Sequence, residues 1–380
     1  MRIAIASSGL GHINRGMEAW AESLAFALYE RGADVTLFKG AGKRINDYDV
    51  ILPTLSRNSR MAKLLAKITQ KFFWRIGLGY PAGVELFIFA VQLLLKVRKG
   101  YDIIHIQQGS LADFLLKAEK LGLLKIPFVF ANGQKGNEEF FKKFKYIQHL
   151  TPLREDPDFR GGNTSNDENR FIIPNFVDSK MFIPGNKEKA RRQLDLPIDK
   201  FIILTVGLID VSVKKMDYFI DEMLTLTKVN QDFFFLIAGS EDKQTKNILK
   251  YGNDLLNNNL RIFIDFPHSQ MPLLYQSADL FVLCSPQEAF GLVLVEAMST
   301  MLPVIYHQNP IMKWVVSDAG IATDMTIKGN LASTIKKYYK NSEYLKLLGQ
   351  KGRARVSLFF DKNVVTDSIQ NMYRTIKFDS

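Results

Sequence analysis

Short apolar runs alternate with longer amphipathic segments along the first half of the chain. The runs have the length and the β-branched content of buried strands, and the segments between them repeat apolar residues at helical spacing. Strands that alternate with helices are typical of right-handed βαβ units and a parallel sheet. The predicted strands are Arg2–Ser7, Asp34–Phe38, Tyr101–Ile106 and Pro127–Phe130, and the first predicted helix is Met17–Arg31.

The same alternation begins again in the second half. The chain has 380 residues, which is too long for one ordinary core. We therefore expect an α/β protein with two doubly wound, Rossmann-like domains. Ligands of such sheets bind beyond the carboxyl ends of the strands, so two facing domains would form an interdomain cleft. The strands predicted here are Phe201–Val206, Phe233–Ala238, Arg261–Ile264, Leu280–Leu283 and Pro303–Tyr306.

Two prolines, Pro174 and Pro184, interrupt the pattern between the halves. We place the N-terminal domain at residues 1–174 and the C-terminal domain at residues 175–361. A final helix is predicted over residues 362–380, and the pattern allows it to pack on either domain.

The composition indicates the class of protein and the compartment in which it works. Apolar residues make up 47% and charged residues 23% of the chain, as in folded globular proteins. The single cysteine, Cys284, excludes an internal disulfide and favours a reducing compartment. The first residues, MRIAIASSGLGH, have a strand pattern rather than that of a signal peptide. We therefore expect a cytoplasmic protein.

The net charge of +11 favours anionic partners such as phosphates, nucleic acid or a lipid surface. Much of it lies between Ser56 and Gly100, which hold nine basic residues and one acid, Glu85. No nucleic-acid-binding motif accompanies this charge, so nucleic acid is not an expected partner.

Within that region the segment RMAKLLAKITQKFFWR predicts an amphipathic helix over Arg60–Arg75. Its two faces suit a helix that lies in an anionic membrane interface. The alternative is a helix packed on its own domain with its lysines in water. The run Val84–Val97 that follows is too short to span a bilayer. The basic stripe is Lys63, Lys67, Lys71 and Arg75, and the neighbouring apolar face is Met61, Leu64, Leu65, Ile68, Phe72 and Phe73, with Trp74 near the end.

The loop Ser7–Glu18 (SSGLGHINRGME) joins the first strand to the first helix. Such a loop binds phosphate in many doubly wound domains through backbone N–H groups and the helix dipole. We take Gly16 as its donor-binding residue, with an ordinary glycine turn as the alternative. Asn14 stands where the dinucleotide fingerprint needs its third glycine, which argues against a nicotinamide dehydrogenase.

Two glutamates lie eight residues apart in QEAFGLVLVEAM. Glu288 falls in a predicted loop after a strand, and Glu296 falls inside the following helix, about 7.5 Å along its axis from Gly291. Between them, the N–H groups of Phe290, Gly291 and Leu292 open the helix and can meet an anion or sugar hydroxyls. Either these are ordinary helix charges or both face one ligand.

Four blocks occur in a fixed order along the chain. They are IPNFVD at 173–178, LTVG at 204–207 with KKMDYFI at 214–220, YQSADLF at 275–281, and SPQEAFGLVLVEAM at 285–298. These blocks resemble the IPNGVD, VGR…KGVDYLI and Y..AD.F…PS..E.FGLV..EAM signatures of the retaining family-4 glycosyltransferases. That family has the two-domain GT-B fold.

The resemblance implies a role for each matching residue. Glu288 would contact the donor sugar and Glu296 the ribose hydroxyls of a UDP- or GDP-sugar. Gly207 and the residues that open the helix, Phe290–Leu292, would lie at the donor. Lys214 would stabilise the diphosphate as the bond breaks, without a metal or other cofactor. A solvated lysine at a helix start is the alternative for Lys214.

Two positions depart from the family pattern. Leu208 stands where the family has an arginine, and Lys215 or Lys313 is a possible substitute. Asn132 stands where the family often has a histidine near the reacting centre, and an asparagine cannot act as a base at neutral pH. His105 ends a predicted strand, either as a buried structural residue or as an acceptor-side contact.

The sequence thus predicts a retaining, metal-independent glycosyltransferase at the inner face of a membrane, with a glycan or lipid-linked acceptor in the N-terminal domain. A catalytically impaired homologue that binds nucleotide sugar, or acts as a scaffold, is one alternative. A nucleotide-sugar epimerase is another. Asp156 and Asp158 have the D-x-D spacing of metal-dependent transferases of another fold, but they lie in a polar loop, and no zinc-ligand spacing occurs.

Overall fold

The chain forms two compact units. Unit 1 comprises Met1–Ile173 and Thr366–Ser380, and unit 2 comprises Pro174–Val365. The structure, a computed structural model, describes residues 1–13, 16–73, 78–98, 100–132, 138–152, 169–228 and 232–378.

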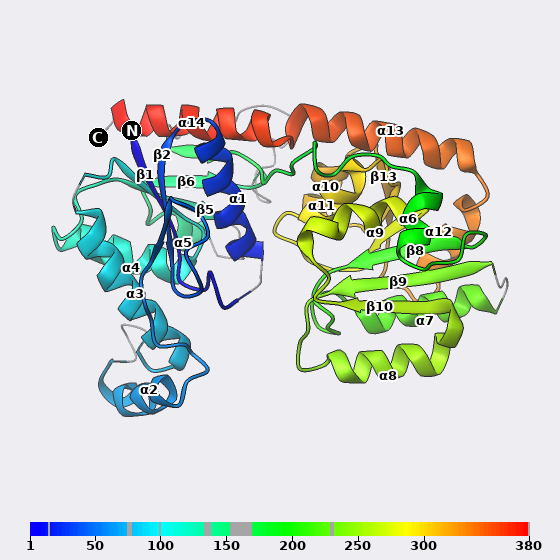
Figure 1. Ribbon diagram of the computed structural model, residues 1–380, viewed down its shortest axis with the longest axis horizontal. Helices are drawn as coiled ribbons and strands as arrows, with labels where there is room; N and C mark the ends of the chain where they lie inside the picture. The colour runs from blue at the N-terminus through cyan, green and yellow to red at the C-terminus, as the bar shows by residue number, and fades with distance from the viewer. Residues whose placement is uncertain are drawn as a thin grey trace. The chain divides into compact units, whose positions relative to one another are not determined.

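Unit 1 is built on a parallel sheet, whose strands among the described residues have the order β3-β2-β1-β4-β5-β6-β7 (Figure 1). Strand β1 has its predicted bounds, and β2, β4 and β5 overlap theirs. Strands β3, β6 and β7 were not predicted, because they are short and polar residues such as Gln148 interrupt their apolar pattern. The strands are β1 Arg2–Ser7, β2 Asp34–Lys39, β3 Asp49–Ile51, β4 Ile103–Ile106, β5 Phe128–Asn132, β6 Tyr146–His149 and β7 Arg170–Ile172.

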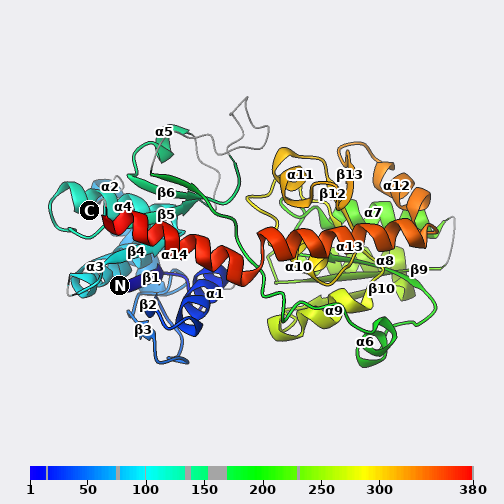
Figure 2. The same ribbon diagram turned by 90° about the horizontal axis from the view of Figure 1, so that it is seen from above.

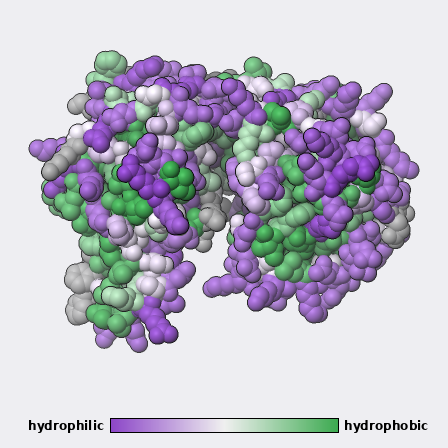
Figure 3. Space-filling model, in the orientation of Figure 1, coloured by the Kyte–Doolittle hydropathy of each residue, from purple (hydrophilic) through white to green (hydrophobic). Residues whose placement is uncertain are grey.

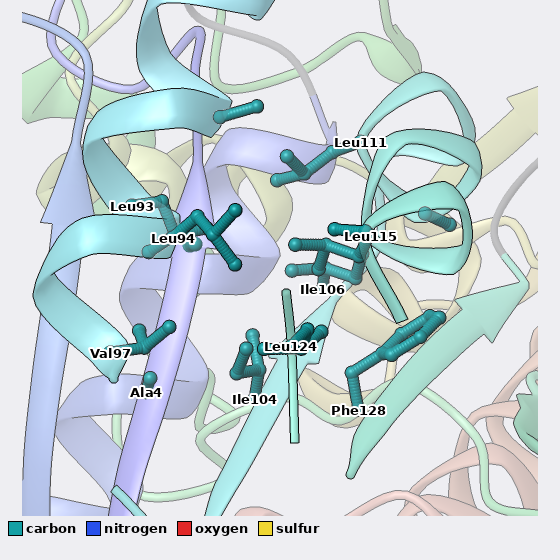
Figure 4. Packing of buried hydrophobic residues seen from close by; sticks show 14 of the residues in the cluster. Ala4, Leu93, Leu94, Val97, Ile104, Ile106, Leu111, Leu115, Leu124 and Phe128 are labelled. Carbon is teal, nitrogen blue, oxygen red and sulfur yellow. The ribbon is translucent and has the colours of Figure 1, made fainter. Parts of the chain in front are cut away.

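Helices cover both faces of this sheet. Figure 4 shows α3 and α4 turning leucines toward the β4 residues Ile104 and Ile106 on one face. Helix α3 therefore packs one of its sides into the core of unit 1. The helices of unit 1 are α1 Gly16–Glu30, α2 Arg60–Phe73, α3 Pro81–Val97, α4 Gly109–Lys120, α5 Glu138–Phe141 and α14 Lys362–Phe378.

The other face of the sheet is covered in part by α14, the last helix of the chain. It begins in unit 2, but its residues from Thr366 belong to unit 1. Figure 2 looks onto this helix as it runs across unit 1, and Arg31 at the end of α1 bonds to Asp367 on it. Its buried side chains are Val365, Thr366, Ile369, Met372, Tyr373 and Ile376.

Unit 2 repeats the architecture with a parallel sheet in the order β10-β9-β8-β11-β12-β13. Strands β8 and β11 have their predicted bounds, and the short edge strand β13 was not predicted. Its strands are β8 Phe201–Val206, β9 Phe233–Gly239, β10 Leu260–Ile264, β11 Leu280–Leu283, β12 Val304–His307 and β13 Gly320–Thr323. Its helices are α6 Lys187–Gln193, α7 Met216–Thr227, α8 Thr245–Leu256, α9 Met271–Ser277, α10 Leu292–Ser299, α11 Pro310–Val316, α12 Asn330–Tyr338 and α13 Ser342–Phe359.

Candidate active site

The structure brings two of the predicted site residues of unit 2 into direct contact. Lys214 lies in the loop between β8 and α7, and Glu288 lies in the loop between β11 and α10. The Lys214 ammonium forms an ion pair with the Glu288 carboxylate. The two side chains are only 16% and 13% exposed, so the pair is shielded but still reachable. Both loops leave the carboxyl ends of neighbouring strands, where ligands of such sheets bind.

A buried carboxylate shapes the loop that carries Lys214. Asp210, 1% exposed, accepts hydrogen bonds from the backbone N–H groups of Lys214 (2.7 Å) and Val213 (3.1 Å) and from the Ser212 hydroxyl (2.9 Å). These bonds fix the course of the loop just before Lys214. Leu208, at the position of the missing arginine, is half-exposed and brings no charge.

Two glycines leave room for the Lys214 side chain next to the end of strand β8. A Cβ on Gly207 would stand 2.9 Å from the Lys214 Cδ, and a Cβ on Gly239 would stand 1.6 Å from the Gly207 carbonyl oxygen. A side chain on Gly239 would clash with this backbone carbonyl, and one on Gly207 would displace the Lys214 side chain. Gly207, predicted as a donor contact, therefore also makes room for the lysine.

Helix α10 begins directly after Glu288. Gly291 precedes its first residue with a φ of +82°, a left-handed conformation that favours glycine. Phe290 is buried with its ring edge on Phe360, and Leu292 is half-buried. The N–H groups of the first turn of a helix have no acceptor within the helix, and the helix dipole makes this end attractive to an anion.

Glu296 lies one turn into α10 and is 6% exposed. Its Oε2 accepts a hydrogen bond of 2.6 Å from the buried Tyr275 hydroxyl, and its Oε1 stands 3.7 Å from Nε2 of His268. The sequence did not predict these two neighbours. Tyr275 belongs to the quoted YQSADLF block, whereas no pattern marked His268.

In unit 1, Asn132 ends β5 beside His149, which ends β6. The two residues are paired in the sheet register, and the Asn132 Nδ2 lies 3.4 Å from the His149 Nδ1. Burial, and then the charge of Arg170, lowers the pKa of His149 to about 4. His149 thus lies next to Asn132, the position at which the family often has a histidine. His149 itself is neutral and 3% exposed. It went unnoticed because β6 itself was not predicted.

His105 lies inside the core of unit 1. It is fully buried, its Nδ1 is 2.6 Å from the Tyr373 hydroxyl, and its ring meets Trp20 edge-on at 5.0 Å. Burial lowers its pKa to about 3. These surroundings favour the structural interpretation of His105 over the acceptor-side one.

A further polar cluster adjoins the loop after β1. The fully buried Glu85 of α3 accepts hydrogen bonds from the Arg57 guanidinium (2.6 Å) and the Arg57 backbone N–H (2.7 Å), and it lies 3.2 Å from Nε2 of His12. Burial raises the pKa of Glu85, but the bonds from Arg57 outweigh it and hold the pKa below its ordinary value. Gly16, the predicted donor contact of this loop, is exposed at the first residue of α1.

Helix α2 packs on unit 1 through its small residues. Ala62 and Ala66 are buried, whereas Met61, Leu64 and Ile68 are 61%, 59% and 62% exposed. The lysines of the basic stripe, Lys63, Lys67 and Lys71, are exposed beside them. Figure 3 shows hydrophobic and hydrophilic residues together over this helix. The side chains of Phe72 and Phe73, and all of Trp74 and Arg75, lie outside the described residues.

Three further residues from the sequence analysis are Cys284, Asp156 and Asp158. Burial raises the pKa of the Cys284 thiol far above its ordinary value, so this cysteine is unreactive. Asp156 and Asp158 lie outside the described residues. Among the residues that are described, no group of His, Cys, Asp and Glu side chains could hold a metal ion, and no helix is long and apolar enough to cross a membrane.

Known proteins resemble this chain in sequence over part of its length. Residues 186–355 match the family model Glycosyl transferases group 1. A D-inositol 3-phosphate glycosyltransferase of Segniliparus rotundus is 26% identical over 194 residues, which cover 50% of this chain and 43% of that protein. A lipopolysaccharide core biosynthesis mannosyltransferase, LpsB of Rhizobium meliloti, is 30% identical over 143 residues, 35% of this chain and 39% of that protein. The chain thus spans less than half the length of these curated relatives.

Solved structures resemble the whole chain in fold. Sucrose-phosphate synthase from Thermosynechococcus elongatus has a TM-score of 0.78 at 18% identity and covers 100% of both chains. Anabaena Alr3699/HepE, solved in complex with UDP-glucose, has a TM-score of 0.74 at 15% identity and covers 99% of this chain and 100% of its own. At such identities the likeness concerns the fold alone.

The fold expected from the sequence is therefore confirmed: two Rossmann-like units with parallel sheets, as in GT-B glycosyltransferases. The family match covers most of unit 2, including Lys214, Glu288 and Glu296. Residues 186–355 thus match the Glycosyl transferases group 1 model, and the whole chain has the fold of the GT-B glycosyltransferases.

Proposed function

We propose that the protein is a retaining, metal-independent glycosyltransferase that moves a sugar from a UDP- or GDP-sugar to a glycan or lipid-linked acceptor. The observation that carries the proposal is the arrangement in unit 2 of Lys214, Glu288 and the start of α10, with Glu296 one turn further on. A cation, a helix N-terminus and two carboxylates suit a ligand with a diphosphate between two sets of hydroxyls.

The chemistry follows from where charge develops. When the sugar leaves the nucleotide diphosphate, negative charge grows on the leaving phosphate. Lys214 and the N–H groups of α10 are preorganised donors that stabilise this charge. Glu288, freed from Lys214 as the diphosphate takes its place, accepts hydrogen bonds from the sugar. In a front-face transfer the leaving phosphate takes the proton of the acceptor hydroxyl, so Asn132 need not act as a base.

The acceptor side of the proposal draws on unit 1. Helix α2 presents apolar side chains beside lysines, the composition of a helix that lies in an anionic membrane interface. A protein held there meets a lipid-linked acceptor at the inner face of the membrane. LpsB, which is similar to this chain over part of its length, is by its name a mannosyltransferase of lipopolysaccharide core biosynthesis.

The test is an assay of purified protein with radiolabelled UDP- and GDP-sugars, with and without membrane extract. We expect transfer with one donor class, with retention of the anomeric configuration in the product by NMR. Nucleotide binding without transfer or hydrolysis of any donor would favour a catalytically impaired homologue. A changed donor sugar without any acceptor would favour an epimerase.

Variants of the three site residues sharpen this assay. Lys214→Ala removes one preorganised donor, and we expect kcat to fall about 100-fold or more. Glu288→Ala should mainly lower kcat, whereas Glu296→Ala should mainly weaken nucleotide binding. Lys250→Ala is the matched control, because that lysine is 81% exposed on α8 and forms an ion pair with its helix neighbour Asp254. Equal activity of Lys214→Ala and Lys250→Ala would contradict the assigned role.

A further inference from the structure

The two carboxylate oxygens of Glu296 have different surroundings. Oε2 points into the core, where the Tyr275 hydroxyl donates to it at 2.6 Å. Oε1 points toward His268, whose Nε2 stands 3.7 Å away, beyond hydrogen-bonding distance. His268 is 66% exposed, whereas Tyr275 is 1% exposed. One oxygen therefore accepts a hydrogen bond from a buried tyrosine, and the other lies beside a mostly exposed histidine.

Tyr275 is held rigidly in this position. It projects from α9, and its ring meets Phe182 at 5.9 Å and Phe281 at 5.8 Å between ring centres. Burial, and then the charge of Glu296, hold the pKa of Tyr275 well above its ordinary value. The hydroxyl thus stays protonated, and its only role toward Glu296 is that of a donor.

Phe182 braces both neighbours of Glu296. Its ring also meets His268, at 5.8 Å. Its backbone carbonyl accepts hydrogen bonds from the Ser299 hydroxyl (2.7 Å) and from Arg353 Nη1 (2.9 Å). Residues of helices α10 and α13 thus hold Phe182, whose ring contacts both Tyr275 and His268.

We propose that Tyr275 is a positioning residue that turns Glu296 into a one-oxygen acceptor for a ribose hydroxyl and so makes the site select ribonucleotides over deoxyribonucleotides. The inference rests on the proposed function, in which Glu296 receives the ribose. With Oε2 fixed by Tyr275, the carboxylate cannot rotate to follow the ligand. A nucleotide that lacks the hydroxyl leaves Oε1 without its partner, and an unmatched buried acceptor is costly.

The test compares nucleotides that differ by one oxygen. Binding of UDP and GDP, and of their 2′-deoxy and 3′-deoxy analogues, is measured by isothermal titration calorimetry. For the wild type we expect one deoxy analogue to bind at least about tenfold more weakly than the ribonucleotide, the range of one hydrogen bond to a charged group. The analogue that is affected identifies the hydroxyl.

Tyr275→Phe retains the ring and removes only the donor. We expect the ribonucleotide to lose about tenfold in affinity while the deoxy analogue is almost unchanged, so the preference collapses. Glu296→Gln should also lose the preference for the ribonucleotide. The double variant should bind the ribonucleotide no more weakly than the single variant with the lower affinity, because Tyr275 acts through Glu296. Thermal melting checks that each variant is folded.

Tyr251→Phe is the matched control. The Tyr251 hydroxyl also donates to a carboxylate, Asp221, but it lies between α8 and α7. It should leave the preference intact. If Tyr275→Phe weakens ribonucleotide and deoxy analogue equally, or leaves the preference unchanged, the inference is wrong while the proposed function stands. If the wild type binds no nucleotide at all, both fail together.

Discussion

Some residues of the proposed site would contact the ligand, whereas others position those residues. Lys214 and Glu288 form an ion pair, which places a cation and a carboxylate together near the start of α10. Asp210 and Gly239 are not predicted to contact substrate, yet together with Gly207 they set the position of Lys214. The chain thus places its single matched cation by backbone geometry rather than by sequence position alone.

Two buried histidines of unit 1 predict how stability depends on pH. Burial lowers the pKa of His105 from 6.5 to about 3, and burial followed by Arg170 lowers that of His149 from 6.5 to about 4. Below pH 6.5 the unfolded chain therefore binds protons that the folded chain refuses. The free energy of unfolding should fall as the pH drops from 7.5 to 5, by up to about 1.4 kcal/mol per pH unit for each histidine.

Urea denaturation at several pH values measures this slope. His105→Asn should reduce the slope, whatever it does to the stability at pH 7.5. The control is His268→Asn, which removes a mostly exposed histidine of unit 2. A slope as steep in His105→Asn as in the wild type would show that His105 is not the cause.

At the scale of elements, α2 differs most from an ordinary surface helix. It turns its alanines inward and leaves Met61, Leu64 and Ile68 exposed. A helix that packed on its own unit through its large apolar face would show the reverse. This burial pattern supports the proposed membrane contact but does not by itself identify the lipid.

Liposome flotation tests that contact. The wild type should float with vesicles that contain phosphatidylglycerol and not with pure phosphatidylcholine. Replacing Lys63, Lys67 and Lys71 by glutamate should lower the partition coefficient at least about 100-fold, since each basic residue near an anionic surface contributes about 1 kcal/mol.

Two further variants separate charge from apolar insertion. Replacing Met61, Leu64 and Ile68 by serine should also reduce flotation and make the remainder more sensitive to salt. The control reverses three exposed lysines of unit 2, Lys337, Lys340 and Lys346, with the same change in net charge. If all variants float as the wild type does, α2 is not a membrane contact.

At the scale of the whole molecule, the last helix of the chain packs into the N-terminal unit. Helix α14 follows unit 2 in sequence but places Tyr373 and three aliphatic residues in the core of unit 1. The Tyr373 hydroxyl meets His105 of β4, so the interior of unit 1 includes residues 268 positions apart. We therefore expect unit 1 to depend on this helix for its stability.

Tyr373→Ala tests this dependence. Large-to-small changes of buried aromatic residues cost about 3–5 kcal/mol, and we expect unit 1 to become sensitive to limited proteolysis while unit 2 stays resistant. Arg374→Ala, at the exposed neighbouring position, is the control. Mass spectrometry of the fragments assigns the cuts, and equal resistance of the two variants would argue against an essential role of α14.

Local patterning was enough to predict most of the fold. Apolar runs predicted β1, β8 and β11 with their bounds, because these central strands are buried on both faces and read as continuous apolar stretches. The quoted blocks predicted the family and the GT-B fold. Edge strands such as β3, β7 and β13 escaped prediction, because three or four residues at a sheet edge carry too little apolar signal.

The sequence by itself therefore predicted the order of elements, the GT-B fold and the residue types of the proposed donor site. Only the tertiary structure decided that Lys214 forms an ion pair with Glu288 and that Tyr275 donates a hydrogen bond to one oxygen of Glu296. It also decided that His105 is buried against Tyr373 of α14. The reason is physical. Periodicity and motifs record what each residue does for its own element, whereas contacts between loops 74 positions apart, or between β4 and the last helix, arise only when sheets and helices pack.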